Sequence, residues 1–167
     1  ERANGLDDRR VVAEARAAKS IGKETTLEED TIDLEYLEAT LHYLTEKIAK
    51  TAREEGIEAR TVTLKLRYAD FTTSTRSHTF PIPTDLECEI FPVVVSLFRK
   101  LYTRRLKVRL LGISLSNFQR GTQLNLFREE QDSKLRNFYF GIERIREKYG
   151  FNALVWGKTL PYLEAKN

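Results

Sequence analysis

Residues 61–68 read TVTLKLRY. From Val62 to Tyr68 every second residue is apolar or aromatic, whereas the residues between them are threonine, lysine and arginine. Such alternation is typical of a β-strand, because successive side chains point to opposite faces of a sheet. We therefore predict a strand with one face in the core and one basic, hydroxyl-rich face.

Further strands are predicted on both sides of this stretch. The segment FTTSTRSHTF at 71–80 is rich in β-branched and aromatic residues, and we expect it to pair with 61–68 as an antiparallel hairpin. Upstream, KSIGKETTLEED at 19–30 also predicts a strand. Its Gly22 indicates a close approach of two backbones, since glycine inside a strand often marks such a position.

The last predicted strand is LKVRLLGISLSNF at 106–118. Its apolar phase slips, because Val108 and Leu110 share one parity and Leu111, Ile113 and Leu115 share the other. One extra residue in a strand shifts the phase in this way, so we expect a β-bulge between Leu110 and Gly112.

Two amphipathic helices are predicted between the strands. In the first, apolar residues recur at steps of three and four over 34–48, with Asp33 as a suitable N-cap. In the second, Thr84 and Glu87 match a capping box ahead of another apolar stripe. Proline disrupts a helix interior, so Pro92 fits this helix only if it lies near the first turn.

The elements follow the order strand, helix, strand, strand, helix, strand, which is the split βαβ plan. We predict an α+β fold (β-α-β-β-α-β), in which two helices cover one face of a four-stranded sheet and the other face stays open to a partner. A C-terminal helical extension follows and ends at Gly150. Its residues at helical spacing are Leu135, Phe138, Ile142 and Ile145. The tail at 151–163 predicts a short strand.

The composition is that of an ordinary globular domain, with 41% hydrophobic and 32% charged residues. No apolar run is long enough to cross a membrane and no secretion signal is visible, so we expect a cytoplasmic protein. The single Cys88 lies in no CxxC or Cys/His pattern, which supports neither a disulfide nor a zinc site. The chain begins at Glu1 and contains no Met, so we expect it to be a piece of a longer protein.

No catalytic constellation can be recognised in the sequence. The acidic clusters at 28–30 and 129–130 are expected at an element end and in a loop, whereas a two-metal site needs carboxylates that converge in space. His42 and His78 have no nucleophile or acidic partner at a suitable spacing. We therefore interpret both histidines as structural, and predict neither a catalytic residue nor a metal ligand in this chain.

The predicted open face of the sheet is the main candidate binding surface. Lysine, arginine and hydroxyl donors at the regular spacing of strands can hold a phosphate backbone. The candidates are Ser20, Lys23, Thr63, Lys65, Arg67, Thr75, Arg76, Lys107 and Arg109. Few aromatic residues fall on this face, which argues against base stacking and for backbone contacts on a duplex. A merely solvated face explains the same pattern equally well.

A pentapeptide with a different character follows the last strand. It consists of Gln123, Leu124, Asn125, Leu126 and Phe127. Large apolar residues in a polar stretch are typical of a peptide anchor, with a hydrogen-bonding head and a hydrophobic plug. The alternative is a strand extension that packs on the domain's own core, and the pentapeptide alone favours neither.

Three stretches together closely resemble the little finger domain of Y-family translesion DNA polymerases. They are KSIGKETTLEED, TVTLKLRYADFTTSTRSHTFPIPTD and KVRLLGISLSNF. The likeness is greatest to the bacterial DinB or polymerase IV branch, and its order and spacing hold over 16–118. Residues 1–15 resemble the end of the thumb domain and a linker. In the segment 119–132, QLNLF matches the family's pentapeptide for the sliding clamp. Residues 133–167 resemble the helical tail of many members.

The resemblance implies a parent protein that copies DNA past lesions, with magnesium held by palm carboxylates. Those carboxylates are absent from this sequence, so we expect the chain alone to need no cofactor and not to polymerise DNA. It also implies phosphate contacts by the segment 20–23, including Gly22, and by Arg76 and Arg109. Lys23 stands where the family usually has arginine, which keeps the charge and loses bidentate geometry.

Two classes of function remain open at this point. In the first, the chain is the DNA-binding and clamp-tethering domain of an error-prone translesion polymerase. Its partners are then the backbone of a primer–template duplex and a sliding clamp, and the chain is a monomer. In the second, it is a non-catalytic protein-interaction adaptor that keeps the little finger fold.

Overall fold

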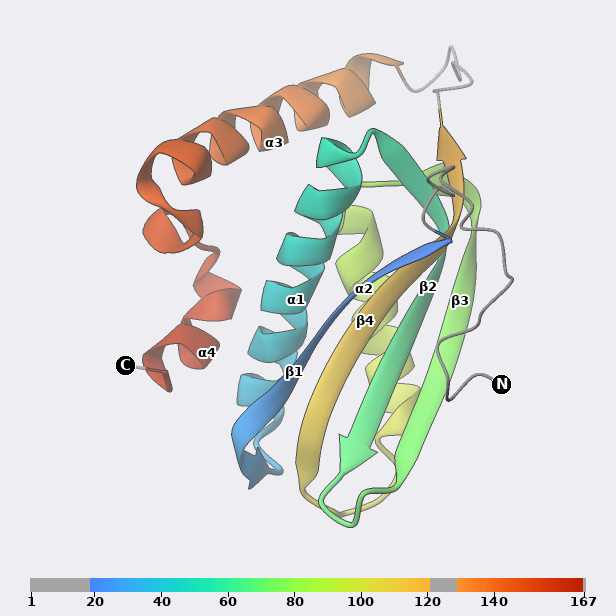
Figure 1. The fold of residues 1–167 in the computed structure, drawn as a ribbon, viewed down its shortest axis with the longest axis vertical. Coiled ribbons are helices and arrows are strands. Elements are labelled where there is room, and N and C mark those ends of the chain that lie inside the picture. The colour runs from blue at the N-terminus through green and yellow to red at the C-terminus, as the bar shows by residue number, and fades with distance from the viewer. Residues whose placement is uncertain (1–18, 121–128, 167) are drawn as a thin grey trace, which may run out of the picture.

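The computed structural model describes residues 19–120 and 129–166, in which four antiparallel strands form one sheet. The strands are β1 (Ser20–Thr31), β2 (Ile57–Tyr68), β3 (Thr73–Thr84) and β4 (Val108–Arg120). Their order across the sheet is β1-β4-β2-β3, so β1 and β3 are the edge strands (Figure 1). The alternating stretch at 61–68 lies in the central strand β2, as its pattern predicted.

Two helices, α1 (Leu34–Glu54) and α2 (Glu87–Leu101), lie on the same face of the sheet (Figure 1). Their apolar faces share one core with the inward residues of the strands. That core includes Leu41, Ile48, Leu64, Leu66, Ile90, Phe98, Leu111 and Ile113. The predicted α+β fold with the split βαβ order is therefore confirmed.

The helix starts differ in how well the sequence predicted them. The carboxylate of Asp33 caps α1, since its Oδ1 accepts from the backbone N–H groups of Glu35 at 2.9 Å and Tyr36 at 3.3 Å. The capping box at α2 was wrong, because Glu87 is itself the first helical residue and Leu86 precedes it. Thr84 instead accepts from the backbone N–H of Leu86 at 3.1 Å, within the turn before the helix.

The strand position without room for a Cβ atom is Gly112 rather than Gly22. A Cβ atom at Gly22 would meet nothing nearer than 3.6 Å, whereas one at Gly112 would lie 2.9 Å from the Cβ of Glu24. The bulge in β4 also lies earlier than predicted. Val108 pairs with Tyr68 and Leu110 pairs with Arg67, so Arg109 is the extra residue.

The C-terminal part forms α3 (Glu129–Tyr149), two short 3₁₀ turns and α4 (Leu160–Glu164). In this tail α3 passes the C-terminal end of α1, and α4 lies beside α1 (Figure 1). A small second core joins the tail to the start of α2, where Leu86, Tyr139 and Ile142 are buried with Leu135, Leu154 and Trp156 packed around them.

The predicted extension is therefore helical, but two details were wrong. The expected strand at 151–163 is absent from the described residues, which form the 3₁₀ turns and α4 there. The inward face of α3 also differs, because Phe138 and Ile145 are 52% and 42% exposed. Arg146 is buried in their place, at 5% exposure. No helix in the described residues is long and apolar enough to span a membrane.

Candidate nucleic-acid interface

The face of the sheet turned away from α1 and α2 carries aligned rows of small hydroxyl side chains. Each row takes one residue from each strand in the order β1, β4, β2, β3. The rows are Ser20, Ser116, Thr61, Thr79; then Gly22, Ser114, Thr63, Ser77; then Glu24, Gly112, Lys65, Thr75; then Thr26, Leu110, Arg67, Thr73. We call this surface the hydroxyl face. The core determines which residues of β2 point to this face. Val62 and Leu64 are buried beneath the helices, so the residues that alternate with them point to the hydroxyl face.

The hydroxyl groups form short contacts along the rows. The Oγ1 of Thr63 lies 2.8 Å from the Oγ of Ser77, and the Oγ1 of Thr61 lies 3.3 Å from that of Thr79. A hydroxyl proton rotates freely, so each of these groups can turn to donate to an incoming phosphate oxygen. The surface therefore offers neutral donors at regular spacing and little that could read a base.

Two cations stand among these hydroxyl groups, and both are engaged. The ammonium of Lys65 lies 2.8 Å from the carboxylate Oε2 of Glu24. The guanidinium of Arg67 donates from Nε to the Oγ1 of Thr73 at 2.9 Å. A hollow of about 350 Å³ opens beside Lys65. It is lined by Gly22, Lys23, Glu24, Thr63, Lys65, Gly112, Ile113 and Ser114.

The structure brings together most of the predicted candidates on this face. Those with the parity of the hydroxyl face are Ser20, Gly22, Thr63, Lys65, Arg67 and Thr75. Lys23 and Arg76 have the opposite parity, because they pair with the core residues Ile113 and Leu64. Both lie on edge strands and remain exposed, so their side chains are accessible at the rims of the sheet rather than on its face.

The other two candidates lie at the end of the sheet where β4 begins. Lys107 precedes the strand and lines a hollow with Asp30 and other carboxylates. Arg109 contacts Oδ2 of Asp30 at 3.4 Å, and its guanidinium lies 4.9 Å from the ring centroid of Phe71. Phe71 is exposed at the β2–β3 turn and adopts a positive φ of 65°. The predicted candidates therefore lie in three places. These are the hydroxyl face, the two edge strands, and the end of the sheet where β4 begins.

The predicted candidates did not include several hydroxyl residues of the rows, which are Ser77, Ser114, Ser116, Thr26, Thr61, Thr73 and Thr79. They also did not include Glu24 and Gly112, which flank Lys65 within one row. A signal was available for Ser114 and Ser116, since they alternate with the apolar Ile113 and Leu115 in the sequence. No local signal marks Glu24, because only the register between β1 and β4 brings it toward Lys65.

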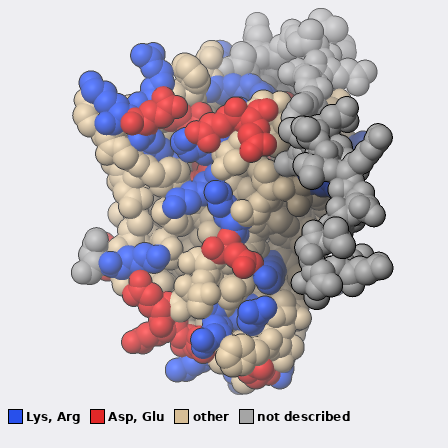
Figure 2. Space-filling view, viewed as in Figure 1, with Lys and Arg blue, Asp and Glu red and all other residues tan. Residues whose placement is uncertain are grey.

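Charges of both signs are interleaved on the side of the molecule seen in Figure 2, and no single basic field covers it. This agrees with the formal net charge of only +3. The long-range field of this side is therefore expected to attract a polyanion only modestly.

A buried polar cluster lies between the helices and the tail. His42 and Glu46 of α1 and Glu87 of α2 bring three potential metal-ligating atoms within 4.8 Å of one another. Arg146 of the tail donates to Glu46 at 2.9 Å and thereby supplies the positive charge that a cation would supply. We therefore assign the cluster to docking of the tail, and the interpretation of His42 as structural stays a prediction. His78 is exposed on β3 with its ring against Phe80, 5.2 Å away.

Burial shifts the pKa values in this cluster in opposite directions. Burial, followed by the charge of Glu46, raises the pKa of Glu87 from 4.5 to about 7. Burial, followed by Lys158 and Arg146, lowers the pKa of His42 from 6.5 to about 4. The Nδ1 of His42 lies 2.9 Å from the hydroxyl of Thr159, and its Nε2 lies 3.4 Å from Glu87.

These shifts predict that Glu87 and His42 each make the free energy of unfolding depend on pH, with opposite signs. Between about pH 4.5 and 7 the folded chain keeps a proton on Glu87 that the unfolded chain has released, so this group makes stability fall as pH rises. Between about pH 4 and 6.5 the unfolded chain protonates His42 and the folded chain does not, so this group makes stability rise with pH. The two slopes offset each other in the wild-type chain.

Replacing Glu87 with Gln removes the falling slope. We compare the free energy of unfolding of Glu87→Gln with that of the wild type at each pH. The difference is expected to shift in favour of the variant by about 1–3 kcal/mol as the pH rises from 5 to 8. Urea titrations at these pH values measure the change, with Glu164→Gln on the exposed end of the tail as the control. A pH profile parallel to that of the wild type would mean that Glu87 is ionised throughout.

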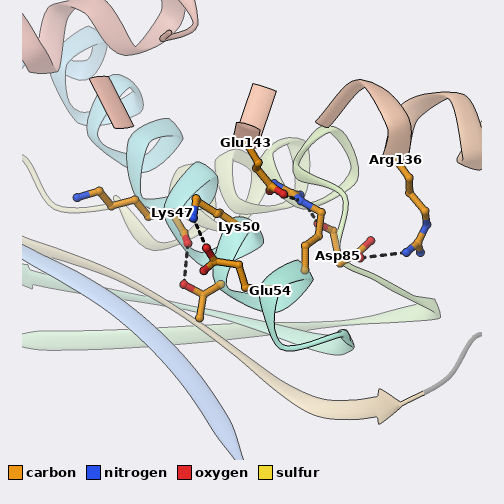
Figure 3. A network of polar contacts seen from close by, with 8 residues as sticks. Lys47, Lys50, Glu54, Asp85, Arg136 and Glu143 are labelled. Carbon is orange, nitrogen blue, oxygen red and sulfur yellow. Dashed lines mark hydrogen bonds and ion pairs between the residues drawn. The ribbon is translucent and has the colours of Figure 1, made fainter. Parts of the chain in front are cut away.

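A second set of ion pairs fastens α3 near the C-terminal end of α1 (Figure 3). Arg53 donates from Nε to Glu143 at 2.7 Å, and from Nη1 to the backbone oxygen of Asp85 at 2.8 Å. Arg136 contacts the Oδ2 of Asp85 at 3.1 Å and also pairs with Glu58 of β2. The tail therefore contacts α1, the start of α2 and the beginning of β2 through charged groups as well as through its small core.

The predicted clamp-binding residues 123–127 lie outside the described residues, and the neighbouring elements end at Arg120 of β4 and begin at Glu129 of α3. Residues 1–15, predicted as the thumb end and linker, also lie outside them.

The sequence pattern of the impB/mucB/samB family C-terminal domain matches residues 18–126. The chain belongs to this family. Its match covers β1 to β4 with both intervening helices, and it extends into the pentapeptide. The tail from α3 onward lies beyond the matched residues.

Several curated members of the family are similar over nearly the whole chain. DNA polymerase IV of Dehalococcoides mccartyi (strain CBDB1) is 40% identical over 158 residues, which are 94% of this chain and 40% of that protein. DNA polymerase IV of Caulobacter vibrioides is 37% identical over 155 residues, which are 92% of this chain and 38% of that protein. The chain thus spans about two fifths of the length of these relatives.

Solved structures agree on the fold. The crystal structure of DinB from Sulfolobus solfataricus aligns with a TM-score of 0.52 at 21% identity, over 61% of this chain and 29% of that chain. The insertion ternary complex of Dbh DNA polymerase gives 0.52 at 20% identity over the same shares. The predicted resemblance to the little finger domain of Y-family polymerases is confirmed by the family match and the polymerase IV relatives.

Proposed function

We propose that this domain holds a primer–template duplex by its phosphates on the hydroxyl face. The observation that carries the proposal is the set of aligned rows, which offer hydroxyl donors with Lys65 and Arg67 among them. Phosphate contacts position a protein without reading sequence, and that suits a polymerase domain that must slide along any template. The family membership supports the same conclusion.

The parent protein is proposed to be a translesion polymerase that works in the cytoplasm. Its magnesium would be held by carboxylates of the palm domain, and this part of the protein would bind DNA without taking part in catalysis. Residues 123–127 are proposed to tether the parent to a sliding clamp, with Phe127 and Leu126 as the apolar plug and Gln123 at the rim. The domain is proposed to act as a monomer.

The grip on DNA should depend strongly on salt. Each phosphate neutralised by a cation contributes about −0.9 to the slope of log affinity against log salt, because counterions are released from the duplex. Arg67→Ala should therefore weaken binding to all sequences alike and make the slope shallower by about 0.9. Fluorescence anisotropy with two unrelated duplexes at several salt concentrations measures both effects.

The matched control is Arg99→Ala, which removes an arginine from α2 on the opposite side of the sheet, where its side chain is 72% exposed. We expect this variant to bind DNA like the wild type. A flat affinity between low and moderate salt in the wild type would contradict phosphate contacts and would favour the adaptor function. Loss of affinity for one sequence only would indicate base readout instead.

A further inference from the structure

One row of the hydroxyl face contains an internal ion pair that reaches across a strand. Glu24 of β1 pairs in register with Gly112 of β4, and Gly112 pairs with Lys65 of β2. The ammonium of Lys65 lies 2.8 Å from the Oε2 of Glu24, so the pair spans the intervening glycine. The carboxylate of Glu24 therefore lies in the same hollow of the hydroxyl face as the ammonium of Lys65.

Gly112 is what makes this arrangement possible. A Cβ atom at position 112 would lie 2.9 Å from the Cβ of Glu24 and 3.4 Å from its Oε2. Contacts below 3.0 Å between such atoms require a shift of the backbone or of the side chain. Without a side chain at 112 the sheet is hollowed, and the hydroxyl-bearing Thr63 and Ser114 line the same hollow.

The ligand that suits this hollow is a phosphodiester. An ammonium group with two hydroxyl groups is a typical set of donors for phosphate oxygens. A carboxylate resembles a phosphate in charge and accepts the same hydrogen bonds, so Glu24 satisfies Lys65 when DNA is absent. When DNA is present, the carboxylate and the phosphate compete for one ammonium.

We propose that Glu24 acts as an intramolecular competitor for one DNA phosphate, and that it thereby weakens the grip of the domain on its duplex. The proposal rests on the function proposed above. The pair is exposed, with 55% of the Glu24 side chain and 34% of the Lys65 side chain accessible. Exposed ion pairs are weak, so a phosphate can open this one. Glu24 lowers the affinity of the domain for DNA without abolishing it.

The test is Glu24→Gln in the whole chain, measured by DNA titration at several salt concentrations. Gln keeps the shape of the side chain and removes the charge. We expect the affinity for duplex DNA to rise about three- to ten-fold, because a negative charge beside a phosphate is removed and Lys65 is released. We also expect the salt slope to steepen, by up to about 0.9, because Lys65 then neutralises a phosphate without competition from a carboxylate.

The matched control is Glu29→Gln, which removes one exposed negative charge from the same strand. It changes the net charge equally, so any long-range effect is subtracted by the comparison. An equal gain in both variants, or an unchanged or lower affinity in Glu24→Gln, would overturn the competitor role while the proposed function stands. Absence of salt-dependent DNA binding in the wild-type chain would overturn both together.

Discussion

Replacing Arg146 with Met is expected to lower the free energy of unfolding by about 3–5 kcal/mol at pH 8. The guanidinium donates to Glu46 at 2.9 Å, and Glu46 is fully buried on α1. It also donates to the backbone oxygen of Leu154 from Nε at 2.9 Å and from Nη2 at 2.7 Å. Its removal leaves a buried carboxylate without its partner, which is among the most destabilising single changes. Urea titration followed by circular dichroism measures the loss.

The loss should be smaller at acid pH and in a paired variant. Burial raises the pKa of Glu46, so without Arg146 this carboxyl group takes up a proton as the pH falls and no longer needs a cation. Glu46→Gln should likewise restore much of the stability of Arg146→Met. Arg144→Met, at an exposed position of α3, is the control. An equal loss at all pH values, without rescue by Glu46→Gln, would place the effect at the Leu154 carbonyl alone.

The second large effect concerns the clamp. Truncating Leu126 and Phe127 to Ala is expected to cost about 2–4 kcal/mol in clamp binding, a range typical of buried apolar anchors. The affinity for a bacterial sliding clamp would fall by about thirty- to a thousand-fold. Thermal stability and DNA affinity should change little, if these residues serve the clamp rather than the domain's own core. A clamp-binding titration beside a melting curve separates the two roles.

The chain offers a control with the same chemistry. Phe140 and Leu160 are exposed on the tail, 62% and 44% accessible, and truncating both to Ala removes the same two kinds of side chain. This control should bind the clamp normally. A large drop in melting temperature of the Leu126, Phe127 variant with clamp binding intact would show that the pentapeptide packs on the domain.

The sheet and its two covering helices could be predicted because each carries a local pattern. The alternation along β2 fixes which residues face the core, and the apolar spacing from Leu34 to Ile48 fixes the inner face of α1. The positions of Lys23 and Arg76 could not be predicted in this way. Both lie on edge strands with weak alternation, so their side is decided by pairing with β4 and β2 rather than by local sequence.

The buried polar cluster was equally hard to predict. Glu46 looks like a solvent-facing residue on α1, and Arg146 looks like one on α3, because each is polar at its own helix surface. They become buried only when the tail packs on α1, and nothing in either segment alone indicates that contact. Glu24 is a similar case, because its proposed role depends on Gly112 of β4. Both β2 and β3 lie between these two residues in the sequence.

The position of Trp156 gives the molecule a natural reporter. It is the single tryptophan of the chain, and it packs in the small core that joins the tail to the start of α2, with its ring 6.1 Å from that of Phe138. Its emission spectrum therefore senses release of the tail, while far-ultraviolet ellipticity also follows the sheet with α1 and α2. If the tail leaves before the sheet unfolds, the two signals will have different midpoints, and a single unfolding energy will no longer describe the chain.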